Sequence, residues 1–255
     1  MSRSTSIGCF FLDTCIILSE ILKENTSRIE KLKKDSNFHN IPCFISNSVK
    51  QESYEKVKQA AGFLAETVRD TIQYSLLESR RKRNIPPEDP IISDDIKALE
   101  ELFSYYNNAV RITKKGLPSP VSILEEWTIT YLGEMLDKGV ALKIPQFLLE
   151  LIKTLLKLTS SLEDSYDQLV AFESDFIKIK SEILDANAIT ALQNLGIHKP
   201  DYLHLASAFS HQTSTNEKTV FVTLDFASIL NKRHLIKKNL KMDCSGPLYA
   251  LYHLV

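Results

Sequence analysis

The stretch GCFFLDTCIIL, residues 8–18, sets an acidic residue, Asp13, at the end of a strongly apolar run. An apolar run of this length is typical of a buried strand in a parallel sheet. The apolar spacing that follows, through Ile17 and Ile21, predicts a helix. A strand followed by a helix is the repeating unit of parallel α/β sheets. Because a buried carboxylate is costly unless its charge is offset, Asp13 marks either a helix cap or a functional site.

A second acid, Glu52, follows another short apolar run, IPCFIS at residues 41–46. Ser48 and Gln51 lie three residues apart in the form of a capping box, which predicts that a helix begins there. Glu52 is then expected in the first helical turn, where the helix dipole favours a carboxylate.

Two further acids lie in the C-terminal region, which again combines helix and strand patterns. Pro200 fits the first turn of a helix that contains Asp201. TVFVTLD (219–225) is a strand pattern that ends in Asp225, and PLYALYHLV (247–255) supplies a last strand. Because functional groups gather at the carboxyl ends of parallel strands, we expect the four acids to converge.

The middle of the chain shows helical periodicity without a convincing strand pattern, and its longest helical period covers residues 162–195. Gly is scarce, at 7 in 255 residues, which favours helices over tight turns. A wide apolar face around residues 145–156 is typical either of a bundle interior or of a subunit contact. We therefore predict a discontinuous α/β core, residues 1–65 and 190–255, with an all-helical insertion at 66–189.

The bulk composition is that of an ordinary soluble globular protein, with 44% hydrophobic and 25% charged residues. A formal net charge of −1 provides no overall basic field for nucleic acid, so local clusters would have to bind it. The cysteines form no CxxC pair and are expected to be reduced thiols. The sequence has no signal-peptide pattern and no apolar stretch of about 20 residues, so we expect a cytoplasmic protein with no membrane association.

Convergence of four carboxylates would be unfavourable without a counterion. Two unit charges about 4 Å apart repel by roughly 1 kcal/mol in water and about 4 kcal/mol at an effective dielectric of 20. Hard divalent cations such as Mg²⁺ and Mn²⁺ prefer oxygen ligands and would offset this repulsion. Asp13, Glu52, Asp201 and Asp225 are therefore a candidate metal site and a candidate phosphoryl-transfer centre.

The order and local context of these acids resemble those of the PIN-domain nucleases. Asp-Thr follows a strand at Asp13, Glu52 opens the next helix, Asp201 lies in PDYLHLASA, and Asp225 ends VTLD. The resemblance implies a PIN-like α/β/α sandwich with a central parallel sheet, in which the four acids are the catalytic group and hold one or two Mg²⁺ or Mn²⁺ ions. It also implies metal-assisted hydrolysis of single-stranded RNA by water, without a covalent intermediate.

Supporting residues can be named around this site. Hydroxyls near such sites often support the carboxylates or a phosphate oxygen, and Thr14 and Thr223 are candidates for that role. His204, three residues after Asp201, shares its helix face and is either a structural histidine or a substrate contact. Two basic clusters are either solvated charge or phosphate contacts sensitive to salt: Arg80, Arg81, Lys82 and Arg83, and Lys232 with Arg233.

The predicted insertion departs from the compact PIN pattern, because it separates Glu52 from Asp201 by about 150 positions. Such an insertion could cap the site, select the substrate, or contact a protein partner or a second copy of the chain. A metal-dependent endoribonuclease is the first expectation, and a catalytically inactive PIN-fold module that binds RNA or protein is the alternative. A DNA-structure-specific nuclease ranks last, because the extra acidic ligands and helical-arch signatures of flap-type relatives are missing from the sequence.

Overall fold

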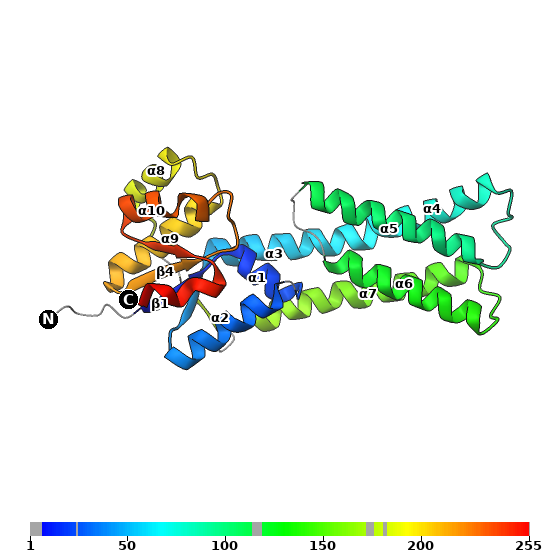
Figure 1. Cartoon of the computed structure of the whole chain (residues 1–255), viewed down its shortest axis with the longest axis horizontal. Helices are drawn as coiled ribbons and strands as arrows, with labels where there is room; N and C mark the ends of the chain where they lie inside the picture. Colours follow the sequence, from blue (N-terminus) through cyan, green and yellow to red (C-terminus); the bar gives the residue numbers. More distant parts are fainter. Residues whose placement is uncertain (1–6, 24, 114–118, 172–175, 181–182, 255) are drawn as a thin grey trace. The chain divides into compact units, whose positions relative to one another are not determined.

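The computed structural model describes residues 7–23, 25–113, 119–171, 176–180 and 183–254. The chain divides into two compact units, which Figure 1 colours along the sequence. The sheet unit consists of residues 1–56 and 165–255, and the helical unit consists of residues 57–164.

Among the described residues, a five-stranded and entirely parallel sheet forms the centre of the sheet unit. In spatial order its strands are β3 (Ile177–Lys180), β2 (Cys43–Ser46), β1 (Ile7–Leu12), β4 (Lys218–Val222) and β5 (Asp243–Ser245). Because all strands run in one direction, their carboxyl ends share an edge of the sheet. The residues that follow β1 and β4 therefore meet, and the Asp13 amide donates to the Val222 carbonyl at 3.0 Å.

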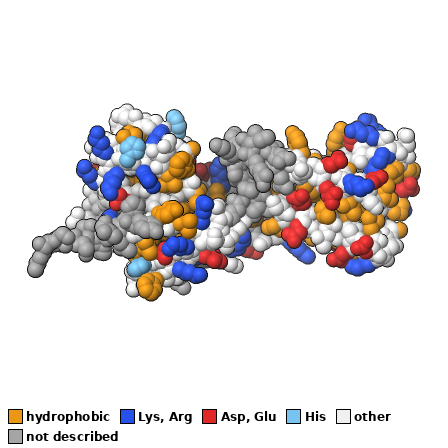
Figure 2. Space-filling model, in the orientation of Figure 1, with side chains coloured by type: hydrophobic (Ala, Val, Ile, Leu, Met, Phe, Trp, Pro, Cys, Tyr) orange, Lys and Arg blue, Asp and Glu red, His pale blue; other side chains and the backbone are white. Residues whose placement is uncertain are grey.

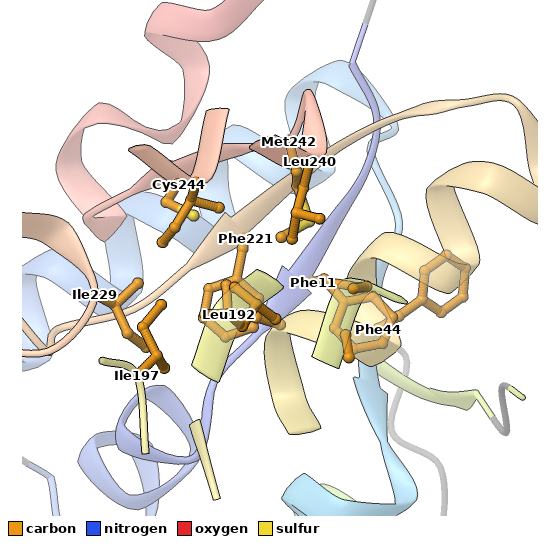
Figure 3. Close-up of a cluster of buried hydrophobic side chains, with 14 of the residues drawn as sticks. Phe11, Phe44, Leu192, Ile197, Phe221, Ile229, Leu240, Met242 and Cys244 are labelled. Carbon is orange, nitrogen blue, oxygen red and sulfur yellow. The ribbon is translucent and has the colours of Figure 1, made fainter. Parts of the chain in front are cut away.

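One face of the sheet packs against the C-terminal helices. Figure 3 shows the apolar cluster on this face, in which Phe11 of β1 and Phe221 of β4 lie among helical side chains such as Leu192. The helices that supply them are α8 (Ala186–Asn194), α9 (Asp201–Thr215) and α10 (Arg233–Leu240). Gly196 follows Leu195, the C-cap of α8, and has a φ of +68°, a conformation that glycine adopts without strain.

The other face is covered by N-terminal helices and by the C-terminal segment. A 3₁₀ helix, η4 (Pro247–Leu254), packs against β1, β4 and β5. The helix α2 (Thr26–His39) packs against η4 and against α1 (Thr14–Ile21). Helices on both faces give this unit the α/β/α arrangement expected from alternating strand and helix patterns.

The helical unit contains α4 (Arg69–Lys82), α5 (Ser93–Thr113), α6 (Ser119–Asp137) and most of α7 (Ile144–Tyr166). The first boundary between the units falls within α3 (Asn47–Gly62), which continues as a π-helical segment, Phe63–Val68. The bundle encloses an apolar core of its own that includes Phe103, Phe147 and Leu151. Among the described residues, no helix is long and apolar enough to cross a membrane.

Two predictions about strands are wrong. Residues 162–195 include a strand, β3, where one helical period is expected. In β3, Ile177 and Ile179 alternate with lysines, which is the pattern of an edge strand that is too short to stand out within helical surroundings. The sheet unit accordingly resumes at residue 165, ahead of β3, rather than at residue 190.

The C-terminal run 247–255 does not supply the last strand. That strand is β5, which pairs with β4, and its Ser245 carbonyl accepts from the Thr223 amide at 3.0 Å. Pro247 has no amide hydrogen to donate to a ladder, and the following residues form η4 instead.

Candidate functional site

Asp13 is the most buried of the four predicted acids and lies directly after β1. One carboxylate oxygen, Oδ1, accepts from the Thr14 amide at 2.8 Å, so Asp13 caps the N-terminus of α1. The other oxygen, Oδ2, accepts from the Thr223 hydroxyl at 2.6 Å and from the Cys15 thiol at 3.3 Å. The predicted helix cap at Asp13 is therefore confirmed, and the oxygen that does not cap the helix lies beside the end of β4, at Thr223.

Opposing effects act on the pKa of Asp13. Burial raises it, but the hydrogen bond and charge of His204 and the donors Thr223 and Cys15 together lower it below its ordinary value. The same surroundings raise the pKa of Cys15 well above its ordinary value, through burial and the negative charge of Asp13. Asp13 is thus held ionised beside a neutral thiol.

His204 lies between Asp13 and Glu52 and is fully buried. Its Nδ1 is 3.0 Å from Asp13 Oδ1, and because an ionised carboxylate only accepts, Nδ1 is the donor. Its Nε2 is 3.3 Å from Glu52 Oε2 but lacks the geometry of a hydrogen bond. Glu52 Oε2 accepts instead from the Thr14 hydroxyl at 2.7 Å. His204 and Thr14 together link the first two acids.

The capping-box pattern predicts Glu52 in the first turn of its helix, and this prediction is wrong. The helix α3 begins at Asn47, one residue before Ser48. The side chain that accepts from the first turn is Ser46, whose Oγ bonds the Val49 amide at 3.2 Å. The helix dipole therefore gives no reason for an acid at position 52, which strengthens the assignment of Glu52 to the site.

Asp201 and Asp225 are brought to the same edge of the sheet. Asp201 is the first residue of α9, and its pKa is raised to about 6 by burial first and then by the negative charges of Asp13 and Asp225. A hydrogen bond from the Ser228 side chain acts in the opposite direction. Asp225 is held in a turn, because its amide donates to Thr223 Oγ1 at 2.9 Å and its Oδ1 accepts from the Ser228 amide at 2.8 Å.

The site therefore carries more negative charge than its neighbours offset. Among the described residues, none of the four acids has an ion pair with lysine or arginine, and His204 is the basic neighbour of two of them, Asp13 and Glu52. An all-oxygen donor set suits a hard divalent cation, and the raised pKa of Asp201 indicates repulsion that such a cation would relieve. As arranged, no three His, Cys, Asp or Glu side chains in the described part of the chain form a ready cation cage. The carboxylate oxygens are bonded to hydroxyls, amides and His204 instead.

Two groups at the site were not singled out from the sequence. Cys15 donates to Asp13 and also accepts from the Leu224 amide at 3.0 Å, and Ser228 supports both Asp201 and Asp225. Ser228 has a sequence signal, since an acid followed three residues later by an amide donor is the spacing of a capped turn. The role of Cys15 has no such signal, because it depends on the packing of α1 beside the end of β4.

Arg80 is not available to nucleic acid, contrary to one reading of the RRKR run. Its guanidinium is fully buried in the helical unit and donates to both carboxylate oxygens of Asp95 at 2.7–3.2 Å. It also donates to backbone carbonyls of the proline-rich loop, those of Pro86, Pro87, Asp89 and Pro90. Arg83 is half-buried and donates to Asp95 at 2.8 Å. This part of the run is structural.

The other basic residues that the sequence suggests as phosphate contacts are exposed or partly exposed. Arg81 and Lys82 form surface ion pairs with Glu78, which contribute little to stability. In the sheet unit, Lys232 Nζ donates to the Gly196 carbonyl at 2.8 Å and Arg233 begins α10. Figure 2 shows Lys and Arg side chains gathered over the part of the sheet unit where α8 and α10 lie.

Comparison of the chain with models of known protein families, with characterised proteins and with solved structures found no match. Function is therefore inferred from the chain's own residues.

Proposed function

We propose that this chain is a PIN-type, divalent-metal-dependent endoribonuclease that hydrolyses phosphodiester bonds of single-stranded RNA. The observation that supports it most is that the acids gather at the carboxyl edge of one parallel sheet, where Asp13 follows β1, Asp225 follows β4, and Thr14 and His204 lie between Asp13 and Glu52. The pKa of Asp201 agrees with this arrangement, because burial first and then the charges of Asp13 and Asp225 raise it to about 6. Asp13 and Glu52 share the basic neighbour His204, but among the described residues Asp201 and Asp225 form no ion pair with a lysine or arginine, and the charges of Asp13 and Asp225 act against ionised Asp201.

Each polar group at the site has a task in such a reaction. When bound, Mg²⁺ or Mn²⁺ would lower the pKa of a water molecule and offset charge on the phosphodiester oxygens. Asp13 would be the best ordered ligand, because Thr14 and His204 donate to one of its oxygens and Cys15 and Thr223 to the other. Asp201 and Asp225, supported by Ser228, would hold the same ion or a second one.

The remaining residues position the acids and the substrate. His204 and the Thr14 hydroxyl hold Glu52 beside Asp13. Lys232 and Arg233, which follow Asp225 in the chain, are candidates for binding substrate phosphates. Contacts of that kind weaken as salt rises, because phosphate binding releases counterions.

The experiment that tests this proposal is cleavage of a defined pool of single-stranded RNA with Mn²⁺, Mg²⁺ or a chelator. We expect metal-dependent cleavage that Asp13→Asn reduces by at least about 100-fold, since a lost metal ligand removes roughly 3 kcal/mol of transition-state stabilisation. Asp185→Asn is a matched control, because Asp185 also caps a helix of the sheet unit, α8, away from the four acids. Undiminished cleavage by Asp13→Asn would rule the assignment out.

A second candidate function, an inactive PIN-fold module that binds a protein, is favoured by one observation in the helical unit. The helix α7 buries Phe147 and Leu151, yet Leu149, Ile152 and Leu156 are 55%, 39% and 60% exposed. These three share a helix face, since they are spaced by three and four residues. Absence of cleavage with either metal, together with a melting temperature unaffected by Mn²⁺, would favour this second function.

A further inference from the structure

We propose that Phe226 is a stacking platform for a nucleotide base, through which the four-acid site selects unpaired over paired strands. This assignment deepens the proposed function and depends on it for the chemistry at the neighbouring acids. Phe226 directly follows Asp225 in the chain, and its side chain is 71% exposed. Because consecutive Cα atoms are only about 3.8 Å apart, an aromatic side chain one residue from a candidate metal ligand is close enough for its ring to reach a base next to a phosphate at the acids.

The backbone around Phe226 is held by hydrogen bonds on both sides. Before it, the Asp225 amide donates to Thr223 Oγ1 at 2.9 Å. After it, the Leu230 amide donates to the Asp225 carbonyl and the Asn231 amide to the Phe226 carbonyl, each at 2.9 Å. The ring is thus presented to solvent from an ordered turn, so little backbone entropy is lost when a ligand stacks on it.

A single exposed aromatic residue is ordinary on a protein surface, so exposure alone does not indicate a binding role, and the position of the residue relative to the four acids has to be compared. Phe38 is even more exposed, at 82%, but it lies near the end of α2, ahead of β2. Parallel strands begin at the edge opposite to the one at which they end, so Phe38 lies away from the four acids. Phe226, by contrast, directly follows one of the four acids, and Arg233, an exposed cation at the start of α10, follows it seven residues later in the chain.

These three elements match the requirements of single-strand binding. Aromatic rings bind successive bases by stacking, and cations bind the phosphates between them. A base inside a duplex already stacks on its neighbours and must leave the helix before it reaches such a ring, which costs free energy. A ring at this position therefore favours RNA whose bases are free.

The test uses the full chain with Ca²⁺ replacing the reactive metal, and measures binding of a fluorescent single-stranded 12-mer RNA by anisotropy. We expect Phe226→Ala to weaken binding about 5- to 100-fold, the range for losing one stacked base. Phe226→Trp should restore it, because an indole also stacks. Phe38→Ala is the control for an exposed ring and should change affinity less than about twofold.

A scan of abasic positions then identifies stacking itself. In the wild-type chain, removal of one particular base should weaken binding as much as Phe226→Ala does, and the same removal should have no further effect in the variant. A perfectly paired RNA of the same sequence should bind the wild type and Phe226→Ala equally.

The outcomes separate this inference from the proposed function. Equal binding of the single strand by the wild type and Phe226→Ala would overturn the role of Phe226, while metal-dependent cleavage by the wild type would still stand. A binding loss in Phe226→Ala without any cleavage by the wild type would support stacking and reject the nuclease. If the wild type binds neither form of RNA, both are rejected.

Discussion

The helical unit buries an arginine together with its counterion, whereas the sheet unit brings four acids to one edge of the sheet, where a histidine contacts two of them, Asp13 and Glu52. Arg80 satisfies its guanidinium with Asp95 and with backbone carbonyls of the loop that follows α4. In the sheet unit, Asp201 has a pKa raised to about 6, because burial and two neighbouring acids act against its charge. Arg80, Asp95 and Asp13 are buried, whereas Glu52, Asp201 and Asp225 are partly exposed. The chain balances the charge of Arg80 with Asp95, but among the described residues it gives Asp201 no ion pair with a lysine or arginine.

This difference separates a charge that the chain pairs within its own fold from charges that it leaves partly unbalanced. A buried ion pair is stable only if each partner remains, so Arg80 and Asp95 fix the loop between α4 and α5. Acids that repel one another reduce the stability of the empty site and increase its affinity for a cation. Removing one charged side chain from each cluster should therefore have opposite effects on stability, a loss at Arg80 and a gain at Asp201.

The largest expected effect is on the stability of the helical unit. Arg80→Met should lower the free energy of unfolding by about 3–5 kcal/mol, because Asp95 is left buried without its main partner. Denaturant unfolding measures the loss. Arg81→Met is the matched control, since Arg81 belongs to the same run but is exposed, and should change stability by less than about 0.5 kcal/mol. Equal effects of the two variants would show that burial of Arg80 is not what stabilises the unit.

An effect of intermediate size is expected on Mn²⁺ affinity at His204, which among the described residues is the one basic side chain that contacts two of the four acids. His204→Ala should weaken Mn²⁺ binding about 10- to 100-fold, because Asp13 and Glu52 lose the side chain that positions them. His204→Asn should recover part of the affinity, since its amide can still donate to Asp13. The Mn²⁺ dependence of the melting temperature reports affinity separately from activity.

His198→Asn provides the comparison for His204, because His198 is exposed and lies in the loop before α9. It should bind Mn²⁺ as the wild type does. Tighter Mn²⁺ binding by His204→Ala would mean that the imidazole competes with the metal instead of positioning its ligands.

The smallest expected effect is the dependence of stability on pH at Asp201. Its pKa in the folded chain, about 6, lies above the ordinary value of 3.8, so ionised Asp201 opposes folding. The penalty is fully present above about pH 6 and disappears as pH falls through 6 towards 3.8. In chelator, Asp201→Asn should therefore be more stable than the wild type at pH 8 by about 1 kcal/mol, a value reduced for partial solvent exposure.

Chemical denaturation between pH 4 and pH 8 measures this difference, which should shrink as the solution becomes more acidic. A stability gain that is constant with pH, or that grows towards pH 4, would contradict the electrostatic origin. Saturating Mn²⁺ should abolish or reverse the advantage of Asp201→Asn, since the cation offsets the same repulsion.

Local patterns predicted the parts of the site that local structure fixes. Asp13 lies at the end of a buried strand and Asp201 at the first turn of a helix, and both follow from apolar periodicity and from proline placement. The contact of His204 with Asp13 and Glu52 joins three separate segments, so no spacing in the sequence contains it. Tertiary packing alone places this side chain.

The two main errors had different physical sources. β3 is an edge strand of four residues, too short for its alternation to outweigh the helical period around it. Arg80 looked exposed because it belongs to a basic run, although Ile72, Leu76 and Arg80 repeat every four residues and are all buried. That repeat continues the apolar face of α4, and it could have indicated which of the cations points inwards.

The order of strands has a consequence for how the chain folds. β2 and its neighbour β3 are about 130 residues apart in sequence, and closing a loop of that length costs roughly 4 kcal/mol in chain entropy. The helical unit lies in between, and an ion pair between Lys58 and Glu163 joins its two ends. If this unit folds first from its local contacts, it brings the segments before and after it together and makes that closure far cheaper. During synthesis, β1 and β2 would then lack their neighbouring strands β4 and β3, and their backbone groups would stay unpaired until the chain beyond the helical unit is made.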